Sequence, residues 1–417
     1  KRRKLRSMFC AEMREFFGRE KILVPSAQSL PSFLKNATIR AMDFSSKKVA
    51  IVADWLTSRG GAERVIFSLA KLFPNATIFT SVFDETAFPE LSNRDVRCTW
   101  LQKLPKKIRK KHQFLLPFFP GAFSKLDLSE FDLIVSSSSS GFSKCVQKNC
   151  SKKTKHVCFC HTPVRFLYHA RDEYIFKFPL PWWGKPVRFF LPKILNWLEK
   201  IDQRAAKNVD FWIANSNFVG ERISKFYHKK STTIYPGVET QSFAAAGKKK
   251  SERKYFLAVG RFIPYKKFDL LVEVFKKNGL KLKLAGRGPD FEKCRELARG
   301  AENIEFLGFA PDENLPNLYA GARAFLFPAE EDFGLTPVEA MAAGTPVIFF
   351  SRGGATESVG EWGTPFSAQT PESLQRAIDT FLKSEKTLDR EKIFERGAEF
   401  DEKNFREKFA DFLTSLE

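Results

Sequence analysis

The sequence predicts an α/β protein made of two successive doubly wound domains, each with a parallel sheet covered by helices on both faces. Three observations support this class. Apolar runs of strand length are continuous, which is typical of strands buried on both faces. Amphipathic helical stretches alternate with these runs. The alternation stops at 236–254 and then starts again, which indicates a second domain of the same design.

The amino-terminal half supplies the first set of elements. KVAIVADW (48–55) reads as a strand, and SRGGAERVIFSLAKLF (58–73) turns through two glycines into an amphipathic helix. Three further stretches read as buried strands that end in small polar residues: FDLIVSSS (131–138), KHVCFCHT (155–162) and VDFWIANS (209–216). Such strand ends meet at one edge of a parallel sheet, where ligands bind in this class.

The carboxyl-terminal half repeats the design after a break. PGVETQSFAAAGKKKSERK (236–254) has no apolar period and is predicted to be the interdomain linker. We expect an amino-terminal domain over 42–240, a carboxyl-terminal domain over 249–397, and a final helix within 398–417 that packs back on the first domain. After the linker, strands are predicted at KYFLAVGRF, KLKLAGRGPD, IEFLGF and ARAFLFPA, and helices at FDLLVEVFKKN and NLPNLYAGA. The two domains should face each other across a ligand-binding cleft.

The charge of the chain is unevenly distributed. The net charge of +21 divides into +7 for residues 1–41, +15 for 42–240 and −1 for 241–417. A basic half joined to a nearly neutral half predicts an anionic partner for the basic half, such as nucleic acid, anionic lipid or a phosphorylated substrate. The longest uncharged apolar stretches are far below the roughly 18 residues that a membrane span needs. We therefore expect a chain that does not cross a bilayer.

Residues 1–41 form a basic amino-terminal extension without clean periodicity. One interpretation is a tail that precedes the true domain start at Met42. The alternative is a basic arm that binds a membrane surface or a partner. On the first interpretation, residues 1–41 are dispensable for catalysis.

The seven cysteines do not indicate a disulfide framework, because their number is odd, the chain is long and no secretory signal precedes them. HVCFCH (156–161) could hold a metal, but no second pair of ligands completes such a site. The alternative is a short buried strand with Cys158 and Cys160 on one face. Reduced thiols in a cytosolic protein are therefore expected.

One stretch, EEDFGLTPVEAMAAGTPVI (330–348), carries most of the functional signal. Thr336 suits a helix N-cap, with Pro337 and Glu339 in the first turn as a capping box, and Gly344 suits the end of the helix. Capping could be the whole role of Glu339. The alternative is binding, because a helix N-terminus attracts phosphate.

The same stretch has features that capping does not explain. Gly334 would let the backbone approach a ligand closely, and Glu331 has no capping duty. Carboxylates accept hydrogen bonds from vicinal sugar hydroxyls. Glu331 and Glu339 could therefore hold the sugar and the ribose at the two ends of a diphosphate.

These residues resemble the carboxyl-domain signature of the retaining glycosyltransferases of family four, which have the GT-B fold. The resemblance extends over most of 47–415 and includes VADWLTSRGGAERV, FCHTPVRFLYH, IANSNFV, YPGVE, VGRFIPYKKFDLLVE and GRGPD. DWLTSRGGAERV with CHTPVRFLYH is most similar to a branch of bacterial mannosyltransferases that build surface polysaccharides. The resemblance implies transfer of a hexose, with mannose from GDP-mannose as the expected donor, to a glycan or polyprenyl-linked acceptor.

The resemblance also implies a role for each site residue. Arg261 and Lys266 match the basic pair that binds the donor diphosphate and steadies the leaving group. Glu331 would bind donor-sugar hydroxyls, with Gly334 and Leu335 offering backbone N–H groups, and Glu339 would take the ribose hydroxyls. Gly60 and Gly61 match a loop beside the diphosphate and the acceptor. His161 matches a loop histidine facing the donor sugar. The alternative for Arg261 and Lys266 is a pair of solvated cations, and the alternative for His161 is a purely structural histidine.

Two absences favour a metal-independent enzyme without a cofactor. The sequence has no Asp-x-Asp, which disfavours metal-chelating glycosyltransferases, and no GxxxxGK[ST], which disfavours a P-loop NTPase. A nucleotide-sugar hydrolase or epimerase on the same scaffold remains an alternative. A basic nucleic-acid-binding protein is another, although no known nucleic-acid motif accompanies the charge. A non-catalytic scaffold is the third.

The basic amino half predicts docking on the inner face of the cytoplasmic membrane. KLPKKIRKKHQFLLPFFP (103–120) places a basic cluster beside apolar and aromatic residues. The stretch 166–192 adds a second mixture of cations and aromatic rings: Trp182, Trp183, Lys185, Arg188, Phe189 and Phe190. Cations are attracted to an anionic leaflet and aromatic rings suit the headgroup region. The alternative is ordinary solvated charge over a partly buried aromatic cluster.

Overall fold

The computed structural model describes residues 47–109, 111–140, 142–147, 154–172, 185–249 and 252–416, without side-chain detail at 112, 113 and 185–189. The predicted extension 1–41 and the domain start expected at Met42 lie outside the described residues. Two parallel sheets organise what is described, as the sequence predicted.

The first sheet has the strand order β3-β2-β1-β4-β5-β6-β7 and belongs to the amino lobe, defined here as the described residues of 47–234 together with helix α17. All its strand pairs are parallel. Its strands are β1 (Val49–Ala53), β2 (Thr77–Thr80), β3 (Val96–Cys98), β4 (Leu133–Ser138), β5 (Lys155–Cys160), β6 (Phe211–Ala214) and β7 (Thr232–Thr233).

The second sheet belongs to the carboxyl lobe, which extends from α9 to α16, and its order is β10-β9-β8-β11-β12-β13. The two sheets share one topology, and all strand pairs of the second sheet are also parallel. In each sheet the first strand in the chain is an inner strand, and the order in which later strands are added reverses once. Its strands are β8 (Tyr255–Val259), β9 (Leu282–Ala285), β10 (Ile304–Gly308), β11 (Ala322–Phe327), β12 (Val347–Phe350) and β13 (Thr364–Phe366).

The inner strands of both sheets are buried on both faces, which explains the continuous apolar runs. In β1, Ile51 faces a cluster that includes α3 (Gly61–Leu72) and α17 (Glu402–Thr414), whereas Val52 faces the cluster of α5 (Phe119–Phe123) and α7 (Lys185–Asn208). α8 (Asn217–Tyr227) packs beside β6. The short helix α4 (Lys106–Arg109) precedes α5. Adjacent residues of one strand therefore belong to two different cores.

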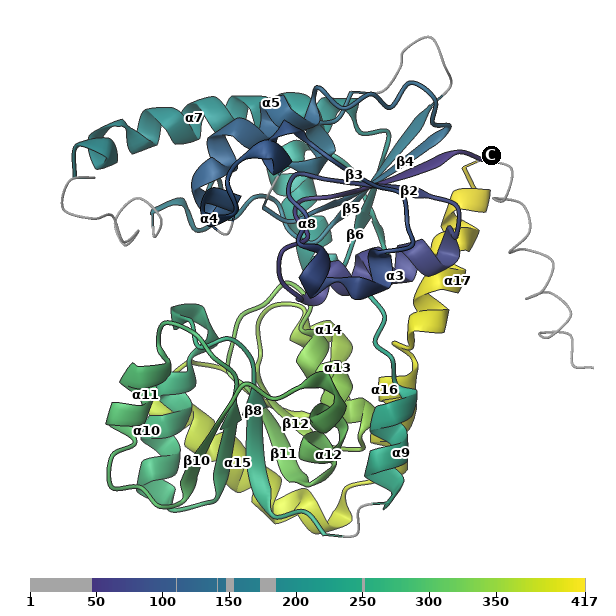
Figure 1. Ribbon diagram of the computed structural model, residues 1–417. Helices are drawn as coiled ribbons and strands as arrows, with labels where there is room; N and C mark the ends of the chain where they lie inside the picture. The colour runs from purple at the N-terminus through teal and green to yellow at the C-terminus, as the bar shows by residue number, and fades with distance from the viewer. Residues whose placement is uncertain are drawn as a thin grey trace, which may run out of the picture. The chain divides into compact units, whose positions relative to one another are not determined.

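The carboxyl lobe has the same sandwich of helix, sheet and helix. Phe256 of β8 faces the cluster of α10 (Phe268–Asn278), α11 (Phe291–Leu297) and α15 (Pro371–Ser384). Leu257, the next residue, faces the cluster of α12 (Leu315–Ala320) and α13 (Leu335–Ala342). α14 (Ala355–Ser358) and α16 (Arg390–Ala398) follow later in the chain. Figure 1 shows the labelled elements.

The predicted linker was wrong in one respect, because 236–254 contains a helix, α9 (Gln241–Lys249). α9 contacts α12 and α13 of the carboxyl lobe. Phe243 is buried against the ring of Tyr319, and a Cβ on Gly247 would lie 2.4 Å from the carbonyl oxygen of Ala343. A small, polar segment with one apolar ring therefore becomes helical through tertiary contact, which local periodicity does not reveal.

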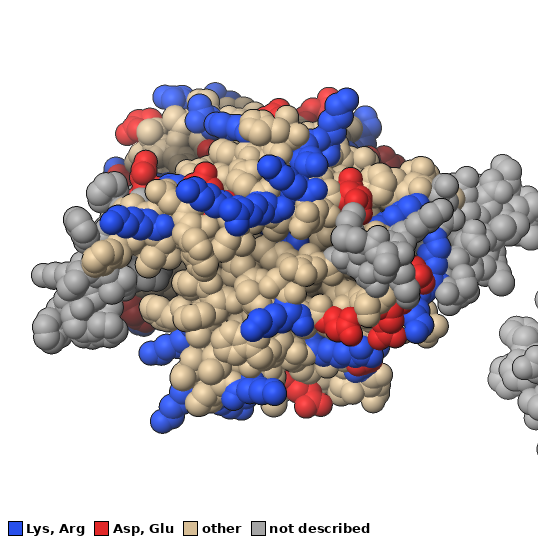
Figure 2. Space-filling view, turned by 90° about the horizontal axis from the view of Figure 1, so that it is seen from above, with Lys and Arg blue, Asp and Glu red and all other residues tan. Residues whose placement is uncertain are grey.

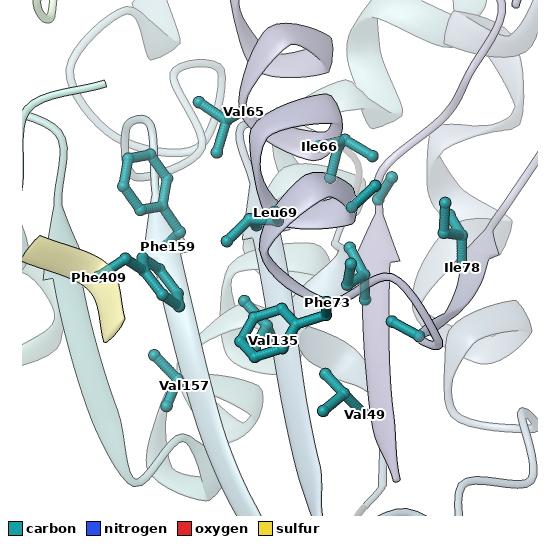
Figure 3. Close-up of a cluster of buried hydrophobic side chains, with 14 of the residues drawn as sticks. Val49, Val65, Ile66, Leu69, Phe73, Ile78, Val135, Val157, Phe159 and Phe409 are labelled. Carbon is teal, nitrogen blue, oxygen red and sulfur yellow. The ribbon is translucent and has the colours of Figure 1, made fainter. Parts of the chain in front are cut away.

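Helix α17 belongs to the amino lobe although it follows the whole carboxyl lobe in the chain. It lies beside α3, and Figure 3 shows Phe409 among the side chains that α3 and the strands contribute. Phe409 meets the ring of Phe73 edge to face. Glu402, at the start of α17, accepts hydrogen bonds from Ser68 (2.7 Å) and Lys71 (2.7 Å) of α3. The last helix therefore completes the first core.

Phe409→Ala should lower the free energy of unfolding by about 3–5 kcal/mol, because a fully buried ring is replaced by a cavity. The measurement is urea unfolding followed by circular dichroism. Lys408→Ala, at the neighbouring exposed position of the same helix, should change stability by no more than about 0.5 kcal/mol. Equal midpoints for the two variants would show that α17 does not complete the amino-lobe core.

Candidate functional site

The predicted site residues follow strands at the reversal points of the two sheets or one strand away from them. In the amino lobe, Gly60 and Gly61 follow β1 and His161 follows β5. In the carboxyl lobe, Arg261 and Lys266 follow β8, and Glu331 follows β11, which is the neighbour of β8. Parallel pairing puts the carboxyl ends of these strands at one edge of each sheet, and the reversal leaves a crevice there.

Lys266 and Glu331 form an ion pair in the carboxyl lobe. Their side chains are only 14% and 16% exposed. Lys266 ends a short 3₁₀ turn (Pro264–Lys266), where its ammonium also lies 5.7 Å from the centre of the Phe327 ring. Arg261 is exposed, and among the described residues no carboxylate pairs with it. One cation is thus held by a carboxylate and the other is open to an incoming anion.

Gly334 is the N-cap of α13 and has φ 86°, a conformation that favours glycine. A Cβ there would lie 2.9 Å from Cζ of Phe327, so the turn has no space for a side chain. The helix starts at Leu335, two residues before Pro337, the predicted first helical position. The capping box predicted for Thr336 and Glu339 is therefore wrong: no side chain caps this helix, and the Thr336 hydroxyl is buried without a partner among the described residues.

Glu339 has other partners. Its carboxylate is 1% exposed, accepts a hydrogen bond from the Tyr319 hydroxyl at 2.7 Å and pairs with Arg64 of the amino-lobe helix α3. The neighbouring Glu339 carboxylate raises the pKa of Arg64. Gly344 has φ 63° just after α13, where the sequence predicted the end of the helix.

The Gly60–Gly61 loop meets the start of α13. A Cβ on Gly61 would lie 2.9 Å from Cδ1 of Leu335, so a side chain there would displace the leucine. Gly60 is the N-cap of α3 and offers no side-chain cap. The Glu63 carboxylate instead bonds back to the Gly60 backbone, the half of a capping box that a glycine N-cap still permits. The predicted glycine loop and the predicted donor turn are thus in contact.

His161 lies at the end of β5, half-buried. Its Nε2 is 2.8 Å from the Ser137 hydroxyl, and its ring meets Phe159 edge to face. Burial lowers the pKa of His161 to about 4, so the imidazole is neutral near pH 7 and carries one donor and one acceptor.

Several polar residues at the same edges were not predicted. Asp54, directly after β1, accepts hydrogen bonds from the backbone N–H groups of Ser139 (2.7 Å), Ser140 (2.9 Å) and Ser143 (2.9 Å). It ties β1 to the loop after β4, across the reversal point. An Asp ending an apolar strand is the signal that could have identified it.

Asp332, next to Glu331, connects the two lobes. It accepts hydrogen bonds from Arg165 and, at 2.5 Å, from Arg222 of α8. The Ser216 hydroxyl donates to its carbonyl oxygen at 2.5 Å. Glu357 of α14 accepts from the N–H groups that begin α8. The residues of each pair are more than a hundred positions apart in the chain. The only sequence signal for these contacts is the presence of opposite charges in distant segments.

Within the described part of the chain, no group of three or more His, Cys, Asp or Glu side chains is placed so that it could hold a metal ion. Cys158 and Cys160 lie in β5 and share one apolar cluster, as the strand interpretation predicted. His156 contacts the Ser136 hydroxyl at 2.8 Å. Five cysteines fall within the described residues and all are free thiols.

Two adjoining family models match the chain. One, described as "Glycosyltransferase Family 4", covers residues 59–242, and the other, "Glycosyl transferases group 1", covers 239–399. Curated relatives include a GDP-mannose-dependent alpha-(1-6)-phosphatidylinositol monomannoside mannosyltransferase of Mycobacterium tuberculosis, 29% identical over 44% of this chain and 54% of the relative. The Escherichia coli O-antigen chain mannosyltransferase B is 48% identical over 14% of this chain and 16% of the relative.

The curated matches are partial. An uncharacterized glycosyltransferase of Methanocaldococcus jannaschii is 27% identical over 49% of this chain, and the match spans 58% of that protein. The chain thus spans less than two thirds of the curated relatives it matches. Solved structures match more broadly: sucrose-phosphate synthase from Thermosynechococcus elongatus has a TM-score of 0.64 at 18% identity, covering 89% of this chain and 99% of that one. WaaG, involved in lipopolysaccharide biosynthesis, gives 0.62 at 16% identity, covering 88% of this chain and 99% of that one.

Glu63→Gln should stabilise the protein at high pH and leave its stability unchanged at low pH. Burial, with a smaller contribution from Asp54, raises the pKa of Glu63 from 4.5 to about 7. The folded protein therefore holds this proton more tightly than the unfolded chain, so the stability it contributes is complete below pH 4.5 and lost as pH rises through 7. Gln keeps the acceptor oxygen and carries no charge.

The expected gain at pH 8 is about 1–2 kcal/mol in urea unfolding, with no difference between variant and wild type at pH 4. Glu90→Gln is the matched control with the opposite sign, because hydrogen bonds from its own backbone lower the pKa of exposed Glu90. A Glu63→Gln variant that is less stable than wild type at pH 8 would contradict the prediction.

Proposed function

The chain belongs to the glycosyltransferases of family 4 and has the GT-B fold, and from this premise we propose that it transfers a hexose from a nucleotide sugar to an acceptor without a metal ion. The observation that carries the proposal is the grouping at the ends of β8 and β11. Exposed Arg261 and the Lys266–Glu331 pair lie there, and α13 follows with Glu339 on its buried side. The two cations suit the diphosphate of a nucleotide sugar, and the two carboxylates suit the hydroxyls of its sugar and its ribose.

Each residue then has one task in the proposed reaction. Arg261 and Lys266 bind the diphosphate and stabilise the charge that it gains as it leaves. Glu331, now paired with Lys266, turns to the sugar hydroxyls, and Glu339 receives the ribose hydroxyls. Neutral His161 can exchange hydrogen bonds with the sugar. The configuration of the anomeric carbon is retained, and Glu331 is assigned to sugar binding, with no role as a covalent nucleophile.

GDP-mannose is the proposed donor. The support is the motif similarity in the amino half and the mannosyltransferase activities of the mycobacterial and O-antigen relatives. The test is a panel of nucleotide sugars, GDP-mannose and UDP-glucose among them, screened for protection against thermal unfolding. NMR of the transfer product then reads its configuration: a β-linked product from an α-linked donor rejects retention. Release of free sugar without an acceptor, at the rate of transfer, would favour the hydrolase alternative.

The proposed acceptor is a glycan or lipid-linked glycan reached at an anionic membrane surface. Three apolar side chains near α4 are strongly exposed: Ile108 (45%), Phe114 (59%) and Phe118 (55%). Lys106, Lys107 and Lys111 are exposed beside them. A cavity of about 480 Å³ opens in the same region, and Trp100, Pro117, Phe118, Trp197 and Ile201 line it, with Lys125 and Arg204. Apolar surface rimmed by cations suits a lipid surface.

The proposed docking surface does not include all of the second predicted stretch. Phe190 and Trp197 of α7 are exposed, whereas Phe166 and Leu167, at the start of the second predicted stretch, are buried in the core. Trp182 and Trp183 lie outside the described residues, and Lys185, Arg188 and Phe189 are described without side chains. In Figure 2, an uncharged area on the face seen from above has Lys and Arg side chains above and below it in the view, with several Asp and Glu side chains among them. No helix within the described residues has the length and hydrophobicity to cross a membrane.

Arg261→Ala should lower kcat/KM for transfer by about a hundredfold or more, because the open cation of the diphosphate clamp is lost. Arg295→Ala is the control, since Arg295 is an exposed arginine of α11 paired with Glu292. EDTA should leave wild-type transfer unchanged. Transfer that EDTA abolishes and Mg²⁺ restores would refute the metal-free clamp.

Replacing Lys106, Lys107 and Lys111 together by Gln should weaken co-sedimentation with phosphatidylglycerol vesicles by about tenfold or more, because each cation near an anionic leaflet contributes roughly 1 kcal/mol. Wild-type binding should also weaken with added salt. The control removes three exposed lysines of the carboxyl lobe, Lys281, Lys383 and Lys386, at the same cost in net charge. Equal losses in both triple variants, or equal wild-type binding to neutral phosphatidylcholine vesicles, would refute a docking surface at α4.

A further inference from the structure

Arg64 forms an ion pair with Glu339, the carboxylate to which the proposed function assigns the ribose hydroxyls. It lies on α3 of the amino lobe, three residues after Gly61, and its guanidinium pairs with Oε1 of Glu339 on α13 of the carboxyl lobe. The Tyr319 hydroxyl, from α12 of the same lobe as Glu339, donates to Oε2. Both carboxylate oxygens therefore already have a partner within the protein.

The two partners of Glu339 differ in the lobe they come from and in their exposure to solvent. Tyr319 is fully buried, so its hydroxyl is a fixed part of the carboxyl lobe. Arg64 is 36% exposed and reaches Glu339 from the opposite lobe. In the described part of the chain no other cationic side chain is within ion-pair distance of Glu339. A carboxylate that is 1% exposed needs compensation for its lost hydration, and here the partly exposed arginine of the amino lobe supplies the charge.

The position of Arg64 ties this pair to the rest of the site. α3 begins at Gly61, whose Cα lies against Leu335 at the start of α13. One end of α3 thus meets the turn proposed to receive the diphosphate, and its first full turn holds the carboxylate proposed to receive the ribose. A ligand that takes Oε1 of Glu339 must break an interlobe ion pair on the helix that also borders its diphosphate.

We propose that Arg64 is a latch displaced by the donor: it compensates Glu339 while the nucleotide site is empty and yields Oε1 to the ribose hydroxyls when the nucleotide binds. The inference rests on the proposed function, because it takes Glu339 as the ribose-binding carboxylate. It makes Arg64 a positioning residue that competes with the nucleotide. With a competing side chain, the apparent affinity for the nucleotide is the intrinsic affinity multiplied by the fraction of molecules in which the site is open.

The latch and the simplest alternative, in which Arg64 is an ordinary binding residue, predict opposite changes in nucleotide affinity when Arg64 is removed. If Arg64 contacted the bound nucleotide favourably, its removal would weaken binding. If it competes with the ribose, its removal strengthens binding, because an unpaired buried carboxylate gains two hydrogen bonds from the vicinal hydroxyls. The gain requires those hydroxyls, so a nucleotide without them should not show it.

The experiment is calorimetric titration at pH 8 of wild type and Arg64→Met with GDP, UDP and their 2′,3′-dideoxy forms. Arg64→Met should bind the preferred diphosphate about threefold to tenfold more tightly than wild type, as expected for a latch closed in most molecules. The dideoxy form should show no such gain. Arg64→Gln, which keeps a neutral donor, should shift affinity in the same direction by less, and it serves as the test variant if Arg64→Met does not fold.

Arg222→Met is the matched control, because it removes another arginine that bridges the lobes, to Asp332, without touching Glu339. Its GDP and UDP affinities should not rise. Equal or weaker binding of the parent diphosphate by both Arg64 variants overturns the latch. An equal gain with the dideoxy form, or with Arg222→Met, also overturns it and assigns the effect to general loosening of the lobes. Failure of wild type to bind either diphosphate overturns the proposed function instead.

Discussion

The arrangement of the site depends on one constraint, the parallel pairing of β8 with β11 at the point where the carboxyl sheet reverses its strand order. Because both strands run in the same direction, the residues that follow them emerge at the same edge. Lys266 and Glu331 meet there although 65 positions separate them in the chain, and no metal or disulfide is needed to bring them together. The amino sheet repeats the rule with β1 and β4, which Asp54 ties together by accepting hydrogen bonds from the loop after β4.

Charge compensation is the second theme of the site. Four mostly buried carboxylates at the interlobe surface each have a cation or a helix N-terminus as partner: Glu331 has Lys266, Glu339 has Arg64, Asp332 has two arginines, and Glu357 receives the first N–H groups of α8. Buried carboxylates without such partners would be costly. A substrate that enters this surface therefore exchanges one set of partners for another, so its net binding energy is the difference between two large terms.

Much of the fold could be predicted because its signals are local. Continuous apolar runs predicted the buried strands, and Gly60–Gly61 and Gly344 marked a helix start and a helix end. The failures have tertiary causes. Thr336 suited an N-cap by residue type, but the left-handed turn at Gly334 starts the helix earlier and leaves that hydroxyl inside. α9 forms because Phe243 and Gly247 fit against neighbouring helices. Arg64 and Arg165 stand in recognisable motifs and Arg222 lies three residues after one, yet their partners lie far along the chain, where local sequence patterns carry no information.

The position of α17 has a consequence for synthesis. Phe405, Phe409 and Leu413 fill the face of the first sheet, but the ribosome adds them only after the entire carboxyl lobe. During translation the amino lobe therefore emerges with α3 and its strands uncovered on that side, an apolar surface exposed while some 160 further residues are made. The nascent chain should thus be a client of ribosome-associated chaperones, and stop codons late in the message should release a protein whose defect lies in its earliest-made half.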